Sequence, residues 1–166
     1  MQPLDAEALC LQLAEQIRPH LKPDTVLVGI RTGGLWLAER LHKLLDITQP
    51  PGAIDTSFYR DDYGAKGLHA SPQRTEIPFS IEDAPVILID DVLYTGRTTR
   101  AALNEIFDFG RPASVELAVL VDRGGRELPV AARYCAVTLP TPLPSAHTLQ
   151  LERATDGSLN LRLIDA

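Results

Sequence analysis

Hydrophobic residues recur along the chain with two spacings, and the two spacings alternate. Between residues 5 and 18 they occupy every third or fourth position, which is typical of one face of an amphipathic helix, and Pro19 ends that segment. Residues 25–30 (TVLVGI) form a short, partly β-branched apolar run that predicts a strand, and helical spacing returns over residues 35–45 after the turn-forming RTGG. The pattern therefore predicts a helix, a strand, a turn and a second helix.

The same alternation continues further along the chain. Apolar and polar residues alternate over residues 53–59, as in a strand with one apolar face, whereas residues 86–90 (VILID) and 114–122 (SVELAVLVD) are nearly continuous apolar runs. Residues 98–110 have helical spacing and end on a glycine. Continuous apolar strands that alternate with helices are typical of a parallel sheet covered on both faces. We therefore predict an α/β fold with a mostly parallel central sheet flanked by helices.

Two segments depart from this pattern. Residues 60–76 have hardly any apolar periodicity and mixed charge, which predicts a long mobile loop. After Pro129 a proline-rich connector leads to two alternating segments, HTLQLE and SLNLRLI, separated by the hairpin signal Asp156-Gly157. We expect a small β appendage over about residues 145–166, placed to cap the ligand edge of the sheet, within a single domain of residues 1–166.

Composition excludes several classes of function. The net charge is −6 and the sixteen Lys and Arg residues do not cluster, which does not favour binding along a nucleic-acid backbone. Cys10 and Cys135 have no metal-binding spacing and are expected to be buried, reduced thiols, and the four histidines match no metal motif. No apolar run approaches the ~18 residues of a membrane span, and the first residues lack a signal-peptide pattern. A cytoplasmic protein without a membrane segment is expected.

Two acids and a hydroxyl-rich turn follow the best strand candidate. Asp90 and Asp91 end the run VILIDD, and residues 95–99 (TGRTT) lie between it and the next helix. Ligands of parallel sheets bind at the carboxyl ends of the strands, and a helix start offers free N–H groups to a phosphate. Carboxylates accept hydrogen bonds from sugar hydroxyls. An isolated acid pair or Thr-Gly turn would indicate only a helix cap or a turn, but the conjunction predicts a ribose 5-phosphate site.

The segment VILIDDVLYTGRT resembles the 5-phosphoribosyl-1-pyrophosphate (PRPP) signature of the type I phosphoribosyltransferases. The segments GIRTGG, DTSFYRDDY, LYTGRTTRAAL and GRPASVELAVLVDRGGRELP follow in the order seen in one branch of that family, the pyrimidine-operon attenuators that are also uracil phosphoribosyltransferases. The likeness begins at about Val26 and is weak in the N-terminal helix. It implies the type I phosphoribosyltransferase fold and an enzyme that converts uracil and PRPP to UMP and pyrophosphate, with Mg²⁺ as cofactor.

The resemblance also implies roles for individual residues. Asp90 and Asp91 would be the catalytic residues, holding the ribose and Mg²⁺, the metal directly or through water. The 5-phosphate would be bound by Thr95, Gly96, Arg97, Thr98 and Thr99. The pyrophosphate would be bound by Arg31, Thr32, Gly33, Arg60 and Arg74. Uracil would be flanked by Val121, Asp122 and Arg123. One departure is that Gly33 stands where the family usually has a basic residue, which removes one expected pyrophosphate contact.

Three interpretations of the function stay open at this point. The first is an active uracil phosphoribosyltransferase with a regulatory role in binding pyrimidine-leader RNA. The second is a nucleotide-sensing RNA-binding protein whose catalysis is vestigial. The third is a phosphoribosyltransferase for another base, because the signature defines the sugar-phosphate donor and says little about the acceptor, although VDRGGRELP favours uracil. The resemblance further implies a homo-oligomer, a dimer or larger.

Overall fold

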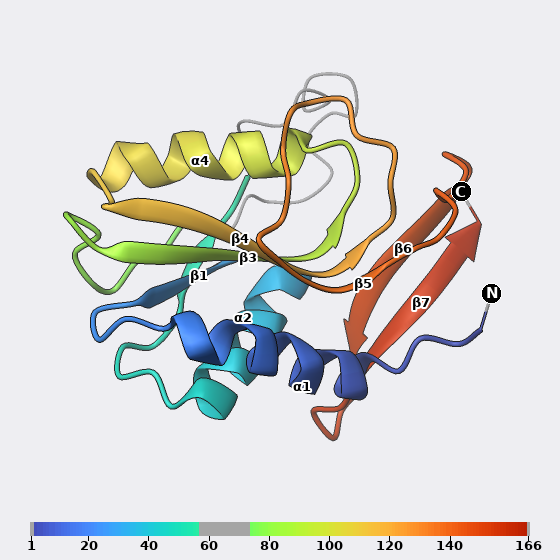
Figure 1. Cartoon of the computed structure of the whole chain (residues 1–166), viewed down its shortest axis with the longest axis horizontal. Coiled ribbons are helices and arrows are strands. Elements are labelled where there is room, and N and C mark those ends of the chain that lie inside the picture. Colours follow the sequence, from blue (N-terminus) through green and yellow to red (C-terminus); the bar gives the residue numbers. More distant parts are fainter. Residues whose placement is uncertain (1, 57–73, 166) are drawn as a thin grey trace.

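The computed structural model describes residues 2–56 and 74–165, in which a parallel sheet of five strands carries helices on both faces (Figure 1). The strand order is β2-β1-β3-β4-β5, and every pairing within it is parallel. The helices are α1 (Ala6–Ile17), the 3₁₀ helix η1 (Arg18–His20), α2 (Gly33–Leu45) and α4 (Arg97–Phe109). The strands are β1 (Val26–Ile30), β2 (Gly52–Ile54), β3 (Pro85–Leu93), β4 (Ser114–Asp122), β5 (Tyr134–Thr138), β6 (His147–Arg153) and β7 (Leu159–Asp165). The predicted α/β class is confirmed.

In β1, and in β3 as far as Ile89, alternate residues face opposite helix layers, which is why these strands read as continuous apolar runs. On the α1 and α2 side, Leu27 and Ile87 belong to one buried cluster. On the α4 side, Val28 and Leu88 belong to a second cluster, together with Ile106 of α4. Figure 1 shows α4 above the sheet and α1 and α2 below it. A strand buried on both faces needs apolar residues at successive positions.

Most predicted boundaries agree with the structure, but the ends of two strands do not. The strand expected over residues 53–59 is β2, which ends at Ile54, and residues 57–59 lie outside the described part of the chain. The strand predicted over residues 114–122 is β4, and the first helix begins after Asp5, whose carboxylate accepts a hydrogen bond from the Ala8 N–H (3.2 Å). The strand predicted to end at Asp90 continues to Leu93, because Asp90, Val92 and Leu93 pair with β4. The predicted end of that strand was therefore wrong. Of the predicted loop, residues 60–73 lie outside the described part of the chain.

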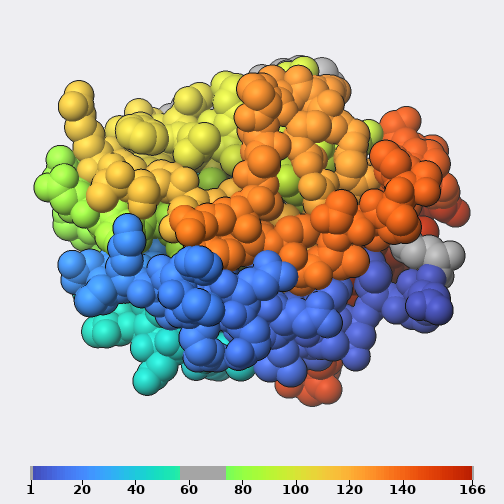
Figure 2. Space-filling view, in the orientation of Figure 1, coloured from blue at the N-terminus to red at the C-terminus, as the bar shows by residue number. Residues whose placement is uncertain are grey.

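Each edge of the sheet is partly covered. At β5, the Gln16 side chain donates to the Cys135 carbonyl (2.8 Å) and accepts from the Cys135 N–H (3.1 Å). At β2, Ala53 exchanges two backbone hydrogen bonds with Glu76 (2.7 and 2.8 Å). On the face of the molecule seen in Figure 2, the segment between β4 and β6 (orange) lies between α1 (blue) and α4 (yellow).

The predicted β appendage forms the antiparallel hairpin β6–β7, which lies beyond the carboxyl ends of the parallel strands (Figure 1). Its turn contains Gly157, whose φ of +89° suits the predicted Asp-Gly turn. Leu149 and Leu151 of β6 and Leu159 of β7 are buried in the cluster formed with α1 and α2. The hairpin is therefore packed into the core as a fixed wall. Within the two described ranges, no helix has the length and apolar character that crossing a membrane would require.

Candidate active site

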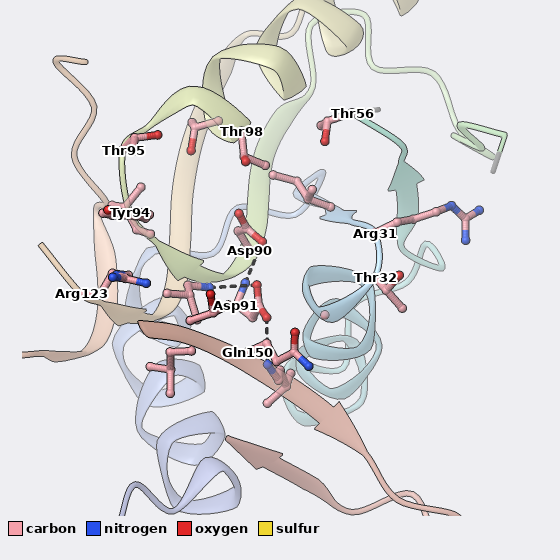
Figure 3. A pocket seen from close by; sticks show the side chains of 18 of the residues that line it. Arg31, Thr32, Thr56, Asp90, Asp91, Tyr94, Thr95, Thr98, Arg123 and Gln150 are labelled. Atoms are coloured by element: carbon pink, nitrogen blue, oxygen red, sulfur yellow. Dashed lines mark hydrogen bonds between the residues drawn. The ribbon is translucent and has the colours of Figure 1, made fainter. Parts of the chain in front are cut away.

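A cleft of about 1310 Å³ lies where the parallel strands end, and the hairpin forms one of its walls (Figure 3). Three parts of the chain supply most of its lining. They are residues 31–33 between β1 and α2, residues 90–99 at the end of β3 and the start of α4, and residues 147–153 of β6. The sequence predicts a ligand at this edge of the sheet, and most of the residues expected to bind it line this cleft.

The side chains of Asp90 and Asp91, near the end of β3, point in different directions. Asp90 is 8% exposed and one of its carboxylate oxygens accepts from the Asp91 N–H (2.9 Å). The Asp91 carboxylate accepts from the N–H groups of Val92 (2.9 Å) and of Leu151 in the hairpin (3.1 Å). In Figure 3 the Asp90 side chain points towards the threonine turn and that of Asp91 towards β6.

The turn between β3 and α4 has the features of a phosphate-binding loop. Gly96 precedes the helix with a φ of +94°, a conformation that strains residues with a side chain, and the Thr95 hydroxyl accepts from the Arg97 N–H (3.1 Å). Thr95 and Thr98 line the cleft and Thr99 is buried. The Arg97 guanidinium instead contacts Glu127 outside the turn (3.2 Å). The contribution of Arg97 to the cleft is therefore that of its backbone, at the start of α4.

Residues 124–128 hold this turn from outside. The Tyr94 carbonyl accepts from the Arg126 guanidinium (2.6 Å), and the Thr95 carbonyl accepts from the N–H groups of Glu127 (2.9 Å) and Leu128 (3.1 Å). A turn whose carbonyls are bound in this way keeps one shape before a ligand arrives, which lowers the entropic cost of binding.

The loop after β1 begins with a cis peptide bond between Arg31 and Thr32. The Arg31 guanidinium donates to the Arg74 carbonyl (3.1 Å) and lies 3.9 Å from the Glu76 carboxylate. Arg31 lines the cleft, whereas Arg74, also expected to bind pyrophosphate, is not among the lining residues. Thr32 caps α2 and Gly33 begins it. A Cβ on Gly33 would lie 2.5 Å from an Asp91 carboxylate oxygen. The glycine that stands where the family usually has a basic residue therefore leaves the space that the Asp91 carboxylate occupies. Arg60 lies outside the described residues.

Of the three residues expected beside uracil, only Arg123 lines the cleft. Val121 is fully buried inside β4, and the Asp122 carboxylate is held by Arg126 (2.6 Å) and by the Gly124 N–H (3.0 Å). Arg123 is 3% exposed, and its guanidinium carbon lies 3.9 Å from the centre of the Tyr94 ring. The guanidinium donates to the carbonyls of His147 (2.8 Å), Pro144 (2.9 Å) and Leu143 (3.3 Å), whereas its buried Nε has no partner among the described residues.

Several residues of the cleft were missed by the sequence analysis. They are Tyr94 in the turn, Trp36 in α2, Thr56 after β2, and Thr148, Gln150 and Glu152 on β6. The alternation of HTLQLE does separate the polar positions of β6 from its leucines, but it cannot say what the polar face meets. In the part of the chain that the structure describes, no group of three or more His, Cys, Asp or Glu side chains could hold a metal ion.

The fold and the cleft define a phosphoribosyltransferase, and the chain belongs to that family, since the model of the phosphoribosyl transferase domain matches residues 4–147. The fold is similar to that of hypoxanthine phosphoribosyltransferase from Staphylococcus aureus, with a TM-score of 0.64 and 22% identity over 84% of this chain and 76% of that one. Hypoxanthine-guanine phosphoribosyltransferase from Bacillus anthracis gives a TM-score of 0.66 and 18% identity over 84% of this chain and 85% of that one.

Within the family, the similar sequences are those of proteins called bifunctional protein PyrR. The protein of Ralstonia nicotianae is 50% identical over 95% of this chain and 91% of its own length. That of Nitrosococcus oceani is 54% identical over 76% of this chain and 71% of its own length. The resemblance to the PyrR branch of the phosphoribosyltransferases is therefore confirmed.

Proposed function

We propose that this chain is a uracil phosphoribosyltransferase, which transfers ribose 5-phosphate from PRPP to uracil and releases UMP and pyrophosphate. The observation that carries the proposal is the position of Asp90 and the residue 95–99 turn in one cleft, at the carboxyl end of β3 and the start of α4. This arrangement joins an acceptor for sugar hydroxyls to a cradle for phosphate. The choice of uracil rests on the likeness to the PyrR proteins.

The turn binds the 5-phosphate and so fixes the donor. N–H groups at the start of α4 and the hydroxyls of Thr95 and Thr98 surround the place where the phosphate sits, and the helix dipole favours its negative charge. With the phosphate held there, Asp90 accepts a hydrogen bond from a ribose hydroxyl. Each charge-assisted bond of this kind is worth about 1.5 to 3 kcal/mol.

The reaction builds positive charge on the anomeric carbon as pyrophosphate leaves. The buried carboxylate of Asp90 stabilises that charge more strongly than it would in water. Arg31 lines the cleft, and its role in this proposal is to offer positive charge to the leaving pyrophosphate. Arg74 and Arg60 are proposed for the same task on the likeness to the family alone. A bound Mg²⁺ would neutralise pyrophosphate oxygens, and its preference for water and phosphate ligands fits a cleft that offers Asp90 rather than a cage of protein ligands.

Uracil occupies the side of the cleft formed by Arg123, Tyr94 and the hairpin. The unpartnered Nε of Arg123 is suited to donate to a carbonyl oxygen of the base, since a buried donor without an acceptor costs about 1 to 3 kcal/mol. Thr148 and Gln150 of β6 supply further polar groups along the same wall. Val121 and Asp122 support this side of the site only through the backbone of β4.

The test is an assay of purified protein with PRPP, Mg²⁺ and a panel of bases. We expect UMP with uracil and little product with hypoxanthine, guanine or orotate, and the reaction without a base gives the rate of PRPP hydrolysis. Product formation with one of the other bases would transfer the proposal to that acceptor. If no base yields a nucleotide at any Mg²⁺ concentration, the catalytic proposal fails.

A second, regulatory function is favoured by the name of the relatives, which are called bifunctional. We propose that UMP bound in the cleft modulates binding of pyrimidine-leader RNA by a homo-oligomer of this chain. A gel shift with leader RNA, with and without UMP and against a scrambled RNA of equal length, tests this directly. Equal binding of both RNAs would remove the regulatory half and leave the enzyme unaffected.

A further inference from the structure

The turn of the β6–β7 hairpin is closed by its own hydrogen bonds. The Asp156 carboxylate accepts from the N–H (2.9 Å) and the hydroxyl (2.7 Å) of Ser158, and the Ser158 carbonyl accepts from the Ala154 N–H (2.9 Å). Two other backbone groups at this end of the hairpin, the Gly157 carbonyl and the Leu159 N–H, are bound by side chains of α1 and α2. The turn is therefore attached to both of these helices.

One glutamate and one arginine make these attachments. A carboxylate oxygen of Glu7, in the first turn of α1, accepts from the Leu159 N–H (2.8 Å). The Arg40 guanidinium, in α2, donates to the Gly157 carbonyl (3.1 Å). The other oxygen of Glu7 forms an ion pair with the same guanidinium, so the side chains and the hairpin backbone close a ring. Figure 1 shows the start of α1 next to the turn of the hairpin.

The bonds to the hairpin matter more than the ion pair that joins them. The side chains of Arg40 and Glu7 are 27% and 42% exposed, and an ion pair this close to water adds little to stability. Leu159 is 3% exposed, so its N–H has little water to bind in place of Glu7. Burial raises the pKa of Glu7, but the bonds from Leu159 and Arg40 outweigh burial and hold that pKa below its ordinary value. The carboxylate therefore binds the N–H as a charged acceptor.

These attachments restrain a strand that lines the cleft. β6 and β7 pair without interruption from His147 to Arg153, so the hairpin moves as one unit. Thr148 and Gln150 of β6 line the cleft. The buried leucines of the hairpin hold it by apolar packing, which is not directional, whereas hydrogen bonds define where the turn sits. The ring formed by Glu7 and Arg40 therefore bears on the position of polar groups that the cleft presents.

We propose that Glu7 and Arg40 are positioning residues of the reaction, which hold the β6–β7 hairpin by its turn so that Thr148 and Gln150 stay in place for the base. Neither of the two charged side chains lines the cleft, so both act through the hairpin. The effect on the reaction rests on the proposed function, whereas the attachment of the hairpin does not. The N-terminal helix then belongs to the structure that holds the substrate, although its sequence resembles the family only weakly.

The first test measures amide hydrogen exchange by NMR in the full-length protein without substrate. In Glu7→Ala the amides of β6 and β7 should exchange about tenfold faster, as expected when a charge-assisted bond that restrains the hairpin is lost. Arg40→Met keeps an apolar stem and should give a similar change, because it also opens the ring. Glu15→Ala is the matched control, since Glu15 lies in the same helix, pairs at the surface with Arg18 (3.1 Å) and should leave hairpin exchange unchanged. Hairpin exchange in Glu7→Ala equal to that of the wild type overturns the proposal.

Exchanging the two charges separates this role from a simple link between the helices. The double variant Glu7→Arg, Arg40→Glu rebuilds an ion pair between α1 and α2, but a guanidinium then faces the Leu159 N–H and a carboxylate faces the Gly157 carbonyl. Two donors or two acceptors form no hydrogen bond, so hairpin exchange should remain at least as fast as in Glu7→Ala. Recovery of wild-type protection would mean that the pair only joins the helices, and would overturn the proposal.

Steady-state kinetics with uracil and PRPP test the consequence for the reaction. Glu7→Ala should raise the KM for uracil about fivefold while kcat stays within about twofold, because ordering a loosened hairpin costs free energy of binding. The charge-exchanged protein should show the same rise, and Glu15→Ala should show none. An unchanged KM for uracil in a variant whose hairpin exchanges faster would refute the positioning role. If the wild type yields no nucleotide, the proposed function fails, and the exchange measurements still decide whether the two residues hold the hairpin.

Discussion

Replacing Arg123 by alanine should destabilise the protein more than any exposed arginine does, because this guanidinium joins three parts of the cleft. It is 3% exposed and donates to three carbonyl groups of residues 143–147. It also stacks at 3.9 Å on Tyr94, in the turn that precedes α4. In Arg123→Ala the connector that leads into the hairpin, residues 143–147, would lose its attachment to that turn.

The size of the effect follows from these contacts. Hydrogen bonds to a charged donor contribute about 1.5 to 3 kcal/mol, but the connector lies at the surface, where water can replace part of what is lost. A cation–π contact adds about 1 kcal/mol. Removing the buried charge also ends its desolvation cost, which offsets part of the loss. We expect a net loss of about 3 kcal/mol, or on the order of 10 °C in Tm for a chain of this size.

Urea unfolding followed by circular dichroism measures this loss as a shift of the midpoint at unchanged slope. Arg162→Ala is the control, because Arg162 is 65% exposed and pairs only at the surface with Glu152, so its loss should cost less than about 1 kcal/mol. Arg123→Lys keeps the charge but not the planar donor geometry, and should restore less than half of the stability. An Arg123→Ala protein within 1 kcal/mol of the wild type would refute the reasoning.

Three further predictions concern Asp90, residues 124–128 that hold the turn before α4, and the buried thiol of Cys10. Asp90→Asn should lower kcat/KM for PRPP at least about a hundredfold with an unchanged circular dichroism spectrum, and activity above a tenth of wild type would contradict the role given to this acid. Gly125→Ala should cost about 2 kcal/mol in urea unfolding, since φ is +87° there and the added Cβ would lie 2.5 Å from the Tyr94 ring; an unchanged midpoint would speak against it. Burial raises the pKa of the Cys10 thiol from 9.0 to about 11, so Ellman's reagent at pH 8 should label Cys135 well before Cys10. Because the unfolded thiol ionises first, this group's contribution to stability is present below pH 9 and is lost as the pH rises towards 11, which unfolding midpoints across that range would detect.

Local patterns predicted most of the elements, because each depends on neighbours in the sequence. The apolar run that forms β4 and the Asp-Gly turn of the hairpin are signals of this kind. The extension of β3 to Leu93 is different, since aspartates are unfavourable in strands and the strand is carried past the acids by the pairing of Asp90, Val92 and Leu93 with β4. The different directions of the two carboxylates, one towards the turn and one towards β6, could not be predicted from the sequence alone.

The site was predictable where one short segment supplies it, and not where distant segments meet. Residues 95–99 form one continuous segment, the turn before α4 and the first residues of that helix, and its chemistry could be predicted from its sequence. Arg123 was selected as a contact to the base, but its bonds to the connector depend on the fold of residues 143–147. The bond between Asp91 and Leu151 joins residues 60 positions apart, so no local pattern carries it.

The side chain of Gln16 bears on how this protein behaves at high concentration. Its amide imitates a peptide group and occupies the outward N–H and C=O of Cys135, much as the pairing with Glu76 occupies Ala53 on the opposite border. Unpaired strand borders are where β proteins stick to one another and aggregate. With both borders partly blocked, copies of this chain should associate through side-chain surfaces rather than by extending the sheet from one molecule into the next.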